Sequence, residues 1–130
     1  MINGEDLVVG RTYFLVSSHK TVSFRHIFED GVAEIVYKGM EGPNRLRFGV
    51  QKNAGGISEI LIFFSELFSL NENFIQARIQ HCWEMSQLIR NKEDMGLREP
   101  LDKISDRRGY LKELEKELEE LKENHPEEFL

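Results

Sequence analysis

The chain has 130 residues, of which 40% are hydrophobic and 31% are charged, and its formal net charge is -6. This composition excludes an intrinsically disordered chain, and the length excludes two large domains. The single cysteine, Cys82, cannot form an intramolecular disulfide, and the first residues lack the basic and apolar regions of a secretory signal, so we expect a cytoplasmic protein. The longest uncharged apolar run, from Ile60 to Ser65, is far shorter than the roughly 20 residues that span a bilayer, so no membrane segment is expected.

The negative charge is concentrated in the second half of the chain. Residues 1–64 contain seven basic and seven acidic residues, whereas residues 65–130 contain ten and sixteen. The segment 109–130 alone holds three lysines and eight glutamates. A solvated helix face explains this acidic segment more simply than a dedicated acidic surface does.

The first half of the chain has the pattern of short β-strands. Glycine 31 follows two acidic residues and predicts a hairpin turn, and the loop at 39–44 is marked by two glycines and a proline. The run at 57–64 is almost continuously apolar, which is typical of a strand buried on both faces. Five segments have the alternation and the bounding turn residues of strands: 12–18, 22–28, 32–38, 45–50 and 57–64.

These strands, followed by helical periodicity, predict an α+β fold. We expect a small antiparallel five-stranded barrel or curled sheet, of the SH3-like or Tudor-like size class, followed by an α-helical hairpin. Closure into a barrel and an open sheet covered by the first helix remain alternatives. We place the β-rich, barrel-like domain at residues 1–68 and the helical hairpin at residues 69–130.

Two helices are predicted in the second half. The sequence from Ser69 to Glu72 matches a capping box, so the first helix is expected to begin there and to run to about Asp94. The second helix is expected from about Leu101 to Glu123, because His125 and the proline after it end it. Its leucines alternate spacings of three and four residues, which is the pattern of a coiled-coil seam: Leu111, Leu114, Leu118 and Leu121.

The leucine seam predicts an association. Burial of four leucines contributes roughly 6–12 kcal/mol at about 1.5–3 kcal/mol each, so we expect something to cover them. The first helix covers them if the hairpin is complete, whereas a second copy or another protein covers them if the second helix projects. The four leucines are therefore the candidate partner-binding residues.

No pattern in the chain predicts catalysis, a metal or a cofactor. His81 and Cys82 are adjacent, but side chains of adjacent helical residues diverge by about 100°, and no second ligand cluster accompanies them. The other histidines have no nucleophile motif near them, and the glycine spacings match neither a phosphate loop nor a dinucleotide fingerprint. We therefore expect a protein that is not an enzyme.

A weaker basic patch surrounds the predicted strand at 45–50. Glu41 is the acidic residue within it, so the patch carries about +3 by count. With exposed aromatic side chains beside it, such a strand face would bind a nucleic-acid backbone, although the chain as a whole is acidic. The candidate nucleic-acid-binding residues of this alternative are Lys38, Arg45, Arg47 and Lys52.

The hypothesis that the sequence favours is a non-enzymatic protein–protein interaction or regulatory accessory module. Its partner would be another protein or a second copy bound through the C-terminal helices. A bacterial or phage inhibitor that occupies a surface of a larger complex is one form of this hypothesis, and a small-barrel nucleic-acid-binding module is the alternative.

Overall fold

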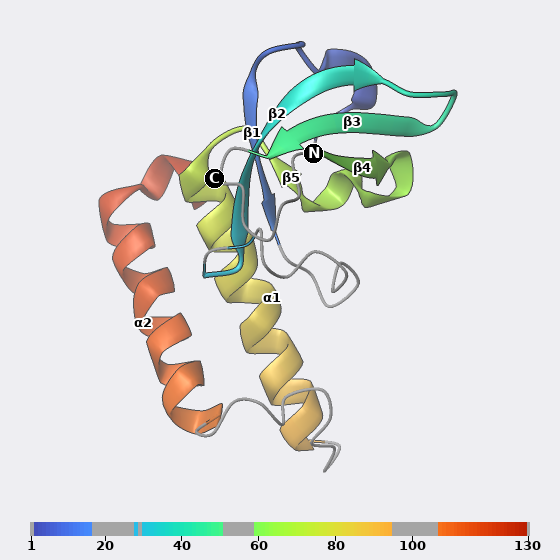
Figure 1. Ribbon diagram of the computed structural model, residues 1–130. Coiled ribbons are helices and arrows are strands. Elements are labelled where there is room, and N and C mark those ends of the chain that lie inside the picture. The colour runs from blue at the N-terminus through green and yellow to red at the C-terminus, as the bar shows by residue number, and fades with distance from the viewer. Residues whose placement is uncertain (1, 17–27, 29, 51–58, 95–106, 130) are drawn as a thin grey trace. The chain divides into compact units, whose positions relative to one another are not determined.

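The computed structural model describes residues 2–16, 28, 30–50, 59–94 and 107–129 (Figure 1). The chain divides into two compact units, residues 1–78 and 79–130, and the division falls within the first helix. No helix in the described ranges is both long enough and apolar enough to cross a membrane. The helices are α1 (Phe74–Asp94) and α2 (Arg107–Asn124).

The first unit contains a five-stranded antiparallel sheet with the strand order β4-β3-β2-β1-β5. A short 3-10 helix, η3 (Phe64–Ser69), connects the two edge strands β4 and β5, and another, η1 (Gly4–Asp6), precedes β1. The prediction of a five-stranded antiparallel sheet followed by two helices is confirmed, as an open sheet rather than a closed barrel. The strands are β1 (Thr12–Val16), β2 (Val32–Met40), β3 (Arg45–Val50), β4 (Glu59–Phe63) and β5 (Leu70–Asn71).

The fifth strand of the sheet is not one that the alternation pattern predicted. Strand β5 has two residues, which is too short to give a periodic signal, and it pairs with β1 through Leu15 and Leu70. Residues 22–27 of the predicted strand at 22–28 lie outside the described residues, and Phe28, which packs against the core of the first unit, is not part of a strand. Within the described sheet, β2 pairs with β1 and with β3.

Two turn predictions can be checked at the ends of β2. Asp30 and Gly31 both have positive φ angles directly before β2, as a tight turn there requires. Strand β2 continues two residues beyond its predicted end, because a register shift between Tyr37 and Gly39 lets it pair further with β3. Gly39 has a φ of 124°, a conformation that residues with a Cβ rarely adopt, so this glycine makes the irregularity possible.

The inner face of the sheet carries the core of the first unit. The Phe48 ring lies edge-on to Tyr13, with centroids 6.4 Å apart, and 5.3 Å from the ring of Tyr37. The Tyr13 hydroxyl accepts a hydrogen bond from the Val8 N–H at 2.9 Å. Burial raises the pKa of the Tyr37 phenol above its ordinary value, and the neighbouring Tyr13 adds to the rise. The other buried members are Leu15, Ala33, Ile35, Leu46, Ile60, Ile62, Leu67 and Leu70.

The outer face of the sheet is covered at β1 and β2. Ala77, in the first turns of α1, packs there with Val16 and Val32, and Phe14 packs against this cluster. The ring of Phe14 also lies 5.9 Å from that of Phe74. Strand β1 is therefore apolar on both faces because both faces are covered, as its sequence predicts.

Helix α1 begins later than predicted, and its cap is Asn73. The Asn73 Oδ1 accepts the N–H of Gln76 at 2.8 Å, and the Asn73 carbonyl accepts the N–H of Ala77 at 3.2 Å. The predicted capping box beginning at Ser69 is wrong, because Ser69 is buried in η3 and the next two residues form β5.

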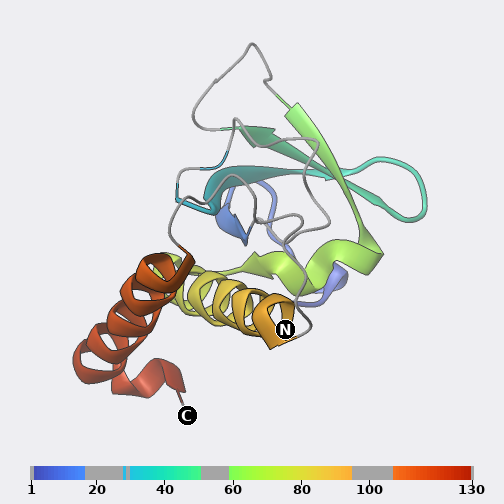
Figure 2. The same ribbon diagram turned by 90° about the horizontal axis from the view of Figure 1, so that it is seen from below.

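The second unit is a helical hairpin in which α1 and α2 lie side by side (Figures 1 and 2). Arg90 of α1 and Glu115 of α2 form an exposed ion pair across it. The predicted start of the second helix lies outside the described residues, whereas its end at Asn124 is one residue from the predicted end. The hairpin core contains Cys82, Ile89 and Leu114, with Met85, Leu88, Tyr110, Leu111 and Leu118 packed around them.

Candidate functional site

One face of strand β4 is exposed to solvent. Ile60 and Ile62 point into the core, whereas Leu61 is 36% exposed and Phe63 is 47% exposed. The prediction of a strand buried on both faces is therefore wrong. The reason is tertiary: the first turn of α1, with Phe74 and Ala77, covers the outer face at β1 and β2, and β4 lies at the far edge of the same sheet.

The register of β3 and β4 brings arginines and apolar side chains together on this wet face. Arg45 is paired with Phe63, and Arg47 is paired with Leu61. The two arginines of β3 therefore lie directly beside the two apolar side chains of β4. Both arginines are exposed. An Arg47 Nε to Glu59 Oε2 distance of 4.0 Å marks a weak ion pair between half-exposed side chains, so this carboxylate neutralises Arg47 only in part.

Lys38 extends the same surface from β2. A Cβ placed on Gly49 of β3 would lie 2.8 Å from Lys38 Cε, so the lysine side chain crosses over this glycine toward β3. The structure thus brings together three of the four predicted basic residues, while Lys52 lies outside the described residues. We call the resulting surface the basic–apolar face; it consists of Lys38, Arg45, Arg47, Glu59, Leu61 and Phe63.

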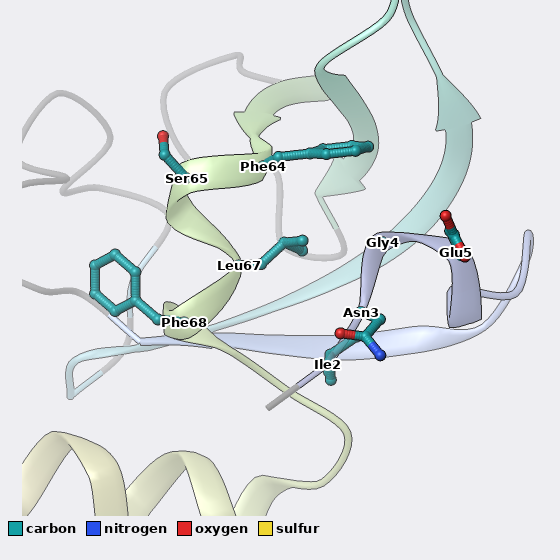
Figure 3. A pocket seen from close by; sticks show the side chains of 8 residues that line it. All are labelled: Ile2, Asn3, Gly4, Glu5, Phe64, Ser65, Leu67 and Phe68. Atoms are coloured by element: carbon teal, nitrogen blue, oxygen red, sulfur yellow. The ribbon is translucent and has the colours of Figure 1, made fainter.

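A hollow of about 540 Å³ begins directly after β4 (Figure 3). Phe64 and Leu67 project from η3 toward Gly4, and Phe64 remains partly exposed. Among the described residues of its lining, Glu5 is the one with a charged side chain, and Phe64, Leu67, Phe68 and Ile2 give the lining a mainly apolar character. The lining residues are Ile2, Asn3, Gly4, Glu5, Phe64, Ser65, Leu67 and Phe68.

The predicted leucine seam lies within the helical hairpin. Leu114 is 4% exposed and is buried with Cys82 and Ile89 of α1, and Leu111 and Leu118 are partly buried around it. Leu121 is also partly buried but is not part of this core. The first helix therefore covers most of the seam, and contact of these leucines with another protein stays a prediction.

His81 and Cys82 are both buried on α1, and Cys82 belongs to the hairpin core. Among the described residues, no group of three His, Cys, Asp or Glu side chains lies close enough to hold a metal ion. Cys82 therefore contributes to the packing of the hairpin core.

Comparisons of the chain with protein-family models, with curated proteins and with solved structures find no match. The apolar members of the basic–apolar face, Leu61 and Phe63, could not be predicted from the sequence. They belong to the run 60–64, which is apolar at every position, so the local pattern does not distinguish the covered face of the strand from the exposed face.

Proposed function

We propose that the chain is a non-enzymatic module that binds another protein through the basic–apolar face. The supporting observation is that Leu61 and Phe63 remain exposed beside Arg47 and Arg45, their register partners on β3, in a sheet whose inner face carries a buried core. Aromatic side chains such as Phe, together with arginines, are enriched at protein–protein interfaces. A module of this kind acts by occupying a surface of a larger assembly.

A second group of exposed aromatic side chains follows β4 in η3. Phe64 and Phe68 are both more than one third exposed and line the adjacent hollow. Exposed apolar residues that stand singly are normal, whereas a contiguous group rimmed by polar residues marks an interaction site. Full burial of a Leu or Phe side chain contributes about 1.5–3 kcal/mol, so covering these half-exposed groups would contribute a substantial part of a binding free energy.

Reversal of charge on the basic–apolar face tests the proposal. We expect Arg45→Glu with Arg47→Glu to weaken capture of the partner protein from a nuclease-treated extract of the source cell by at least about tenfold, which is about 1.4 kcal/mol. Both side chains are exposed, so the thermal unfolding temperature should change little. Quantitative co-precipitation, with the bound protein identified by mass spectrometry, is the measurement.

Two exposed lysines of α2 offer a matched control. Lys112→Glu with Lys116→Glu changes the net charge by the same amount but leaves the sheet unaltered, so capture should persist. Equal loss with both double variants would show a non-specific charge effect, and equal retention with both would remove the basic–apolar face as the binding surface.

Nucleic-acid binding is the second candidate function. The observation in its favour is that the exposed ring of Phe63 lies opposite Arg45, with Arg47 and Lys38 further along the same face, which combines phosphate-binding cations with a stacking platform. The net charge of -6 opposes it. In this case nuclease treatment of the extract removes the captured material, and the charge-reversed variant fails to bind oligonucleotides.

A further inference from the structure

The backbone groups of β4 that point away from the sheet can be assigned. The Phe64 N–H donates to the Asn44 carbonyl at 3.2 Å, which makes these two residues a hydrogen-bonded pair of the ladder. Hydrogen-bonded and non-hydrogen-bonded pairs alternate in an antiparallel ladder, so Ile60 and Ile62 direct their N–H and C=O groups toward β3. Glu59, Leu61 and Phe63 therefore direct theirs outward.

An independent contact supports this assignment. The Phe63 N–H donates to the Glu66 Oε1 at 3.0 Å, and Glu66 lies in η3, beyond the end of β4. An N–H used in the ladder with β3 would not reach that carboxylate. Glu66 thus caps the C-terminal end of the outer edge, and the central outward groups are the N–H and C=O of Leu61.

The outer edge of β4 has no partner strand among the described residues. Native sheets usually protect such edges with charges, prolines, bulges or a covering element, because an exposed edge pairs readily with another chain. On the outer face of β4, Glu59 is the one charge, and Leu61 and Phe63 are exposed. This edge is therefore suited to receive a strand.

We propose that an extended segment of the partner protein adds to β4 as a further strand, paired through the backbone of Leu61, and that its outward side chains are acidic. This inference rests on the proposed function and specifies its binding mode. In strand addition the main-chain hydrogen bonds supply affinity, and the alternate side chains supply specificity. Here the alternate positions face two different surfaces.

The inward and outward positions of the added strand have different neighbours. Inward side chains would lie beside Ile60 and Ile62, which favours apolar residues. Outward side chains would lie beside Leu61 and about 10 Å from β3, because neighbouring strands are about 4.8 Å apart. Arg47 already extends from β3 to the carboxylate of Glu59 on β4, so its guanidinium points in the direction of an outward carboxylate on the next strand. The partner segment should therefore alternate acidic and apolar residues.

Synthetic peptides of about six residues test this mode, since strands of that length are typical. We expect a peptide that alternates glutamate and valine to bind the full-length chain, and a peptide that alternates lysine and valine to bind at least about tenfold more weakly. Binding of the first peptide should slow hydrogen exchange of the Leu61 amide, as measured by NMR. The Ile60 and Ile62 amides already pair with β3 and should change little.

Leu61→Pro is the informative variant. Proline removes the outward N–H, and it is tolerated on edge strands where that N–H faces solvent, so the sheet should stay folded while the peptide affinity falls at least about tenfold. Leu61→Val keeps the N–H and an apolar side chain, and should bind within about twofold of the unaltered chain. If Leu61→Pro does not fold, protection of the Leu61 amide in the unaltered chain decides the question.

The outcomes separate this inference from the proposed function. Peptide binding without protection of the Leu61 amide, or equal binding by Leu61→Pro, would overturn strand addition while leaving the basic–apolar face as a binding surface. Equal or tighter binding of the lysine peptide would overturn the acidic partner. Failure of every peptide would overturn the extended mode, and a charge reversal without effect on protein capture would overturn the proposed function separately.

Discussion

Leu114→Ala is expected to lower the free energy of unfolding of the helical hairpin by about 2–5 kcal/mol, the usual cost of removing a buried leucine side chain. Leu114 is 4% exposed and is the one leucine of the seam that is fully buried with Cys82 and Ile89. Urea denaturation followed by far-UV circular dichroism, with amide exchange in α2 to assign the loss to the second unit, measures the effect.

Leu121 provides the matched control on the same helix. It is partly buried outside the hairpin core, so Leu121→Ala should cost less than about 1 kcal/mol. Equal losses at both positions would contradict the hairpin packing. A free energy of unfolding that rises with protein concentration would also contradict it, because the seam would then be buried between copies.

Phe48→Ala is expected to destabilise the sheet by about 3–5 kcal/mol, because Phe48 is fully buried on the inner face and its ring contacts those of Tyr13 and Tyr37. Chemical denaturation, with amide exchange in β2 and β3 as the local readout, measures this loss. Phe63, on the neighbouring strand and the opposite face, is the matched control.

Phe63→Ala should change the free energy of unfolding by no more than about 0.5 kcal/mol, because the ring is 47% exposed. It should nevertheless weaken capture of the partner protein. Destabilisation as large as that of Phe48→Ala would mean that the outer face of β4 is covered, and the basic–apolar face would then not be a binding surface.

The sequence predicted those strands that show a clear alternation of residues and that pair with a neighbouring strand over several residues. The alternation at 32–38 and 45–50 corresponds to β2 and β3, and the two apolar faces of residues 12–16 are both covered. Strand β5 was missed because its two residues are held by pairing with β1, a contact between residues far apart in the chain. A pattern within a short window carries no information about such a contact.

The start of α1 shows tertiary structure overriding a local motif. Ser69 and Glu72 have the spacing of a capping box, yet Leu70 pairs with Leu15, so this segment is extended and cannot begin a helix. The helix begins at the next residue that can cap it, Asn73. When a possible helix cap and a strand pairing compete for the same residues, the other contacts of the sheet determine which of the two forms.

Local patterns in the sequence indicate the basic members of the basic–apolar face but not its apolar members. Arg45 and Arg47 alternate with core residues along one strand, so their exposure follows from local periodicity. Leu61 and Phe63 lie in a uniformly apolar run, and their exposure depends on which strands α1 covers. Their proximity to the arginines depends on the register between β3 and β4, which no local pattern fixes.

The most direct test of the account compares two positions on the full-length chain by site-specific photo-crosslinking in the source cell. p-Benzoylphenylalanine is introduced in place of Phe63, on the basic–apolar face, or in place of Leu121, at the end of the leucine seam. We expect a covalent protein adduct from position 63 and none from position 121. An adduct from position 121 alone would contradict the account, because the C-terminal helices would then be the surface that meets the partner.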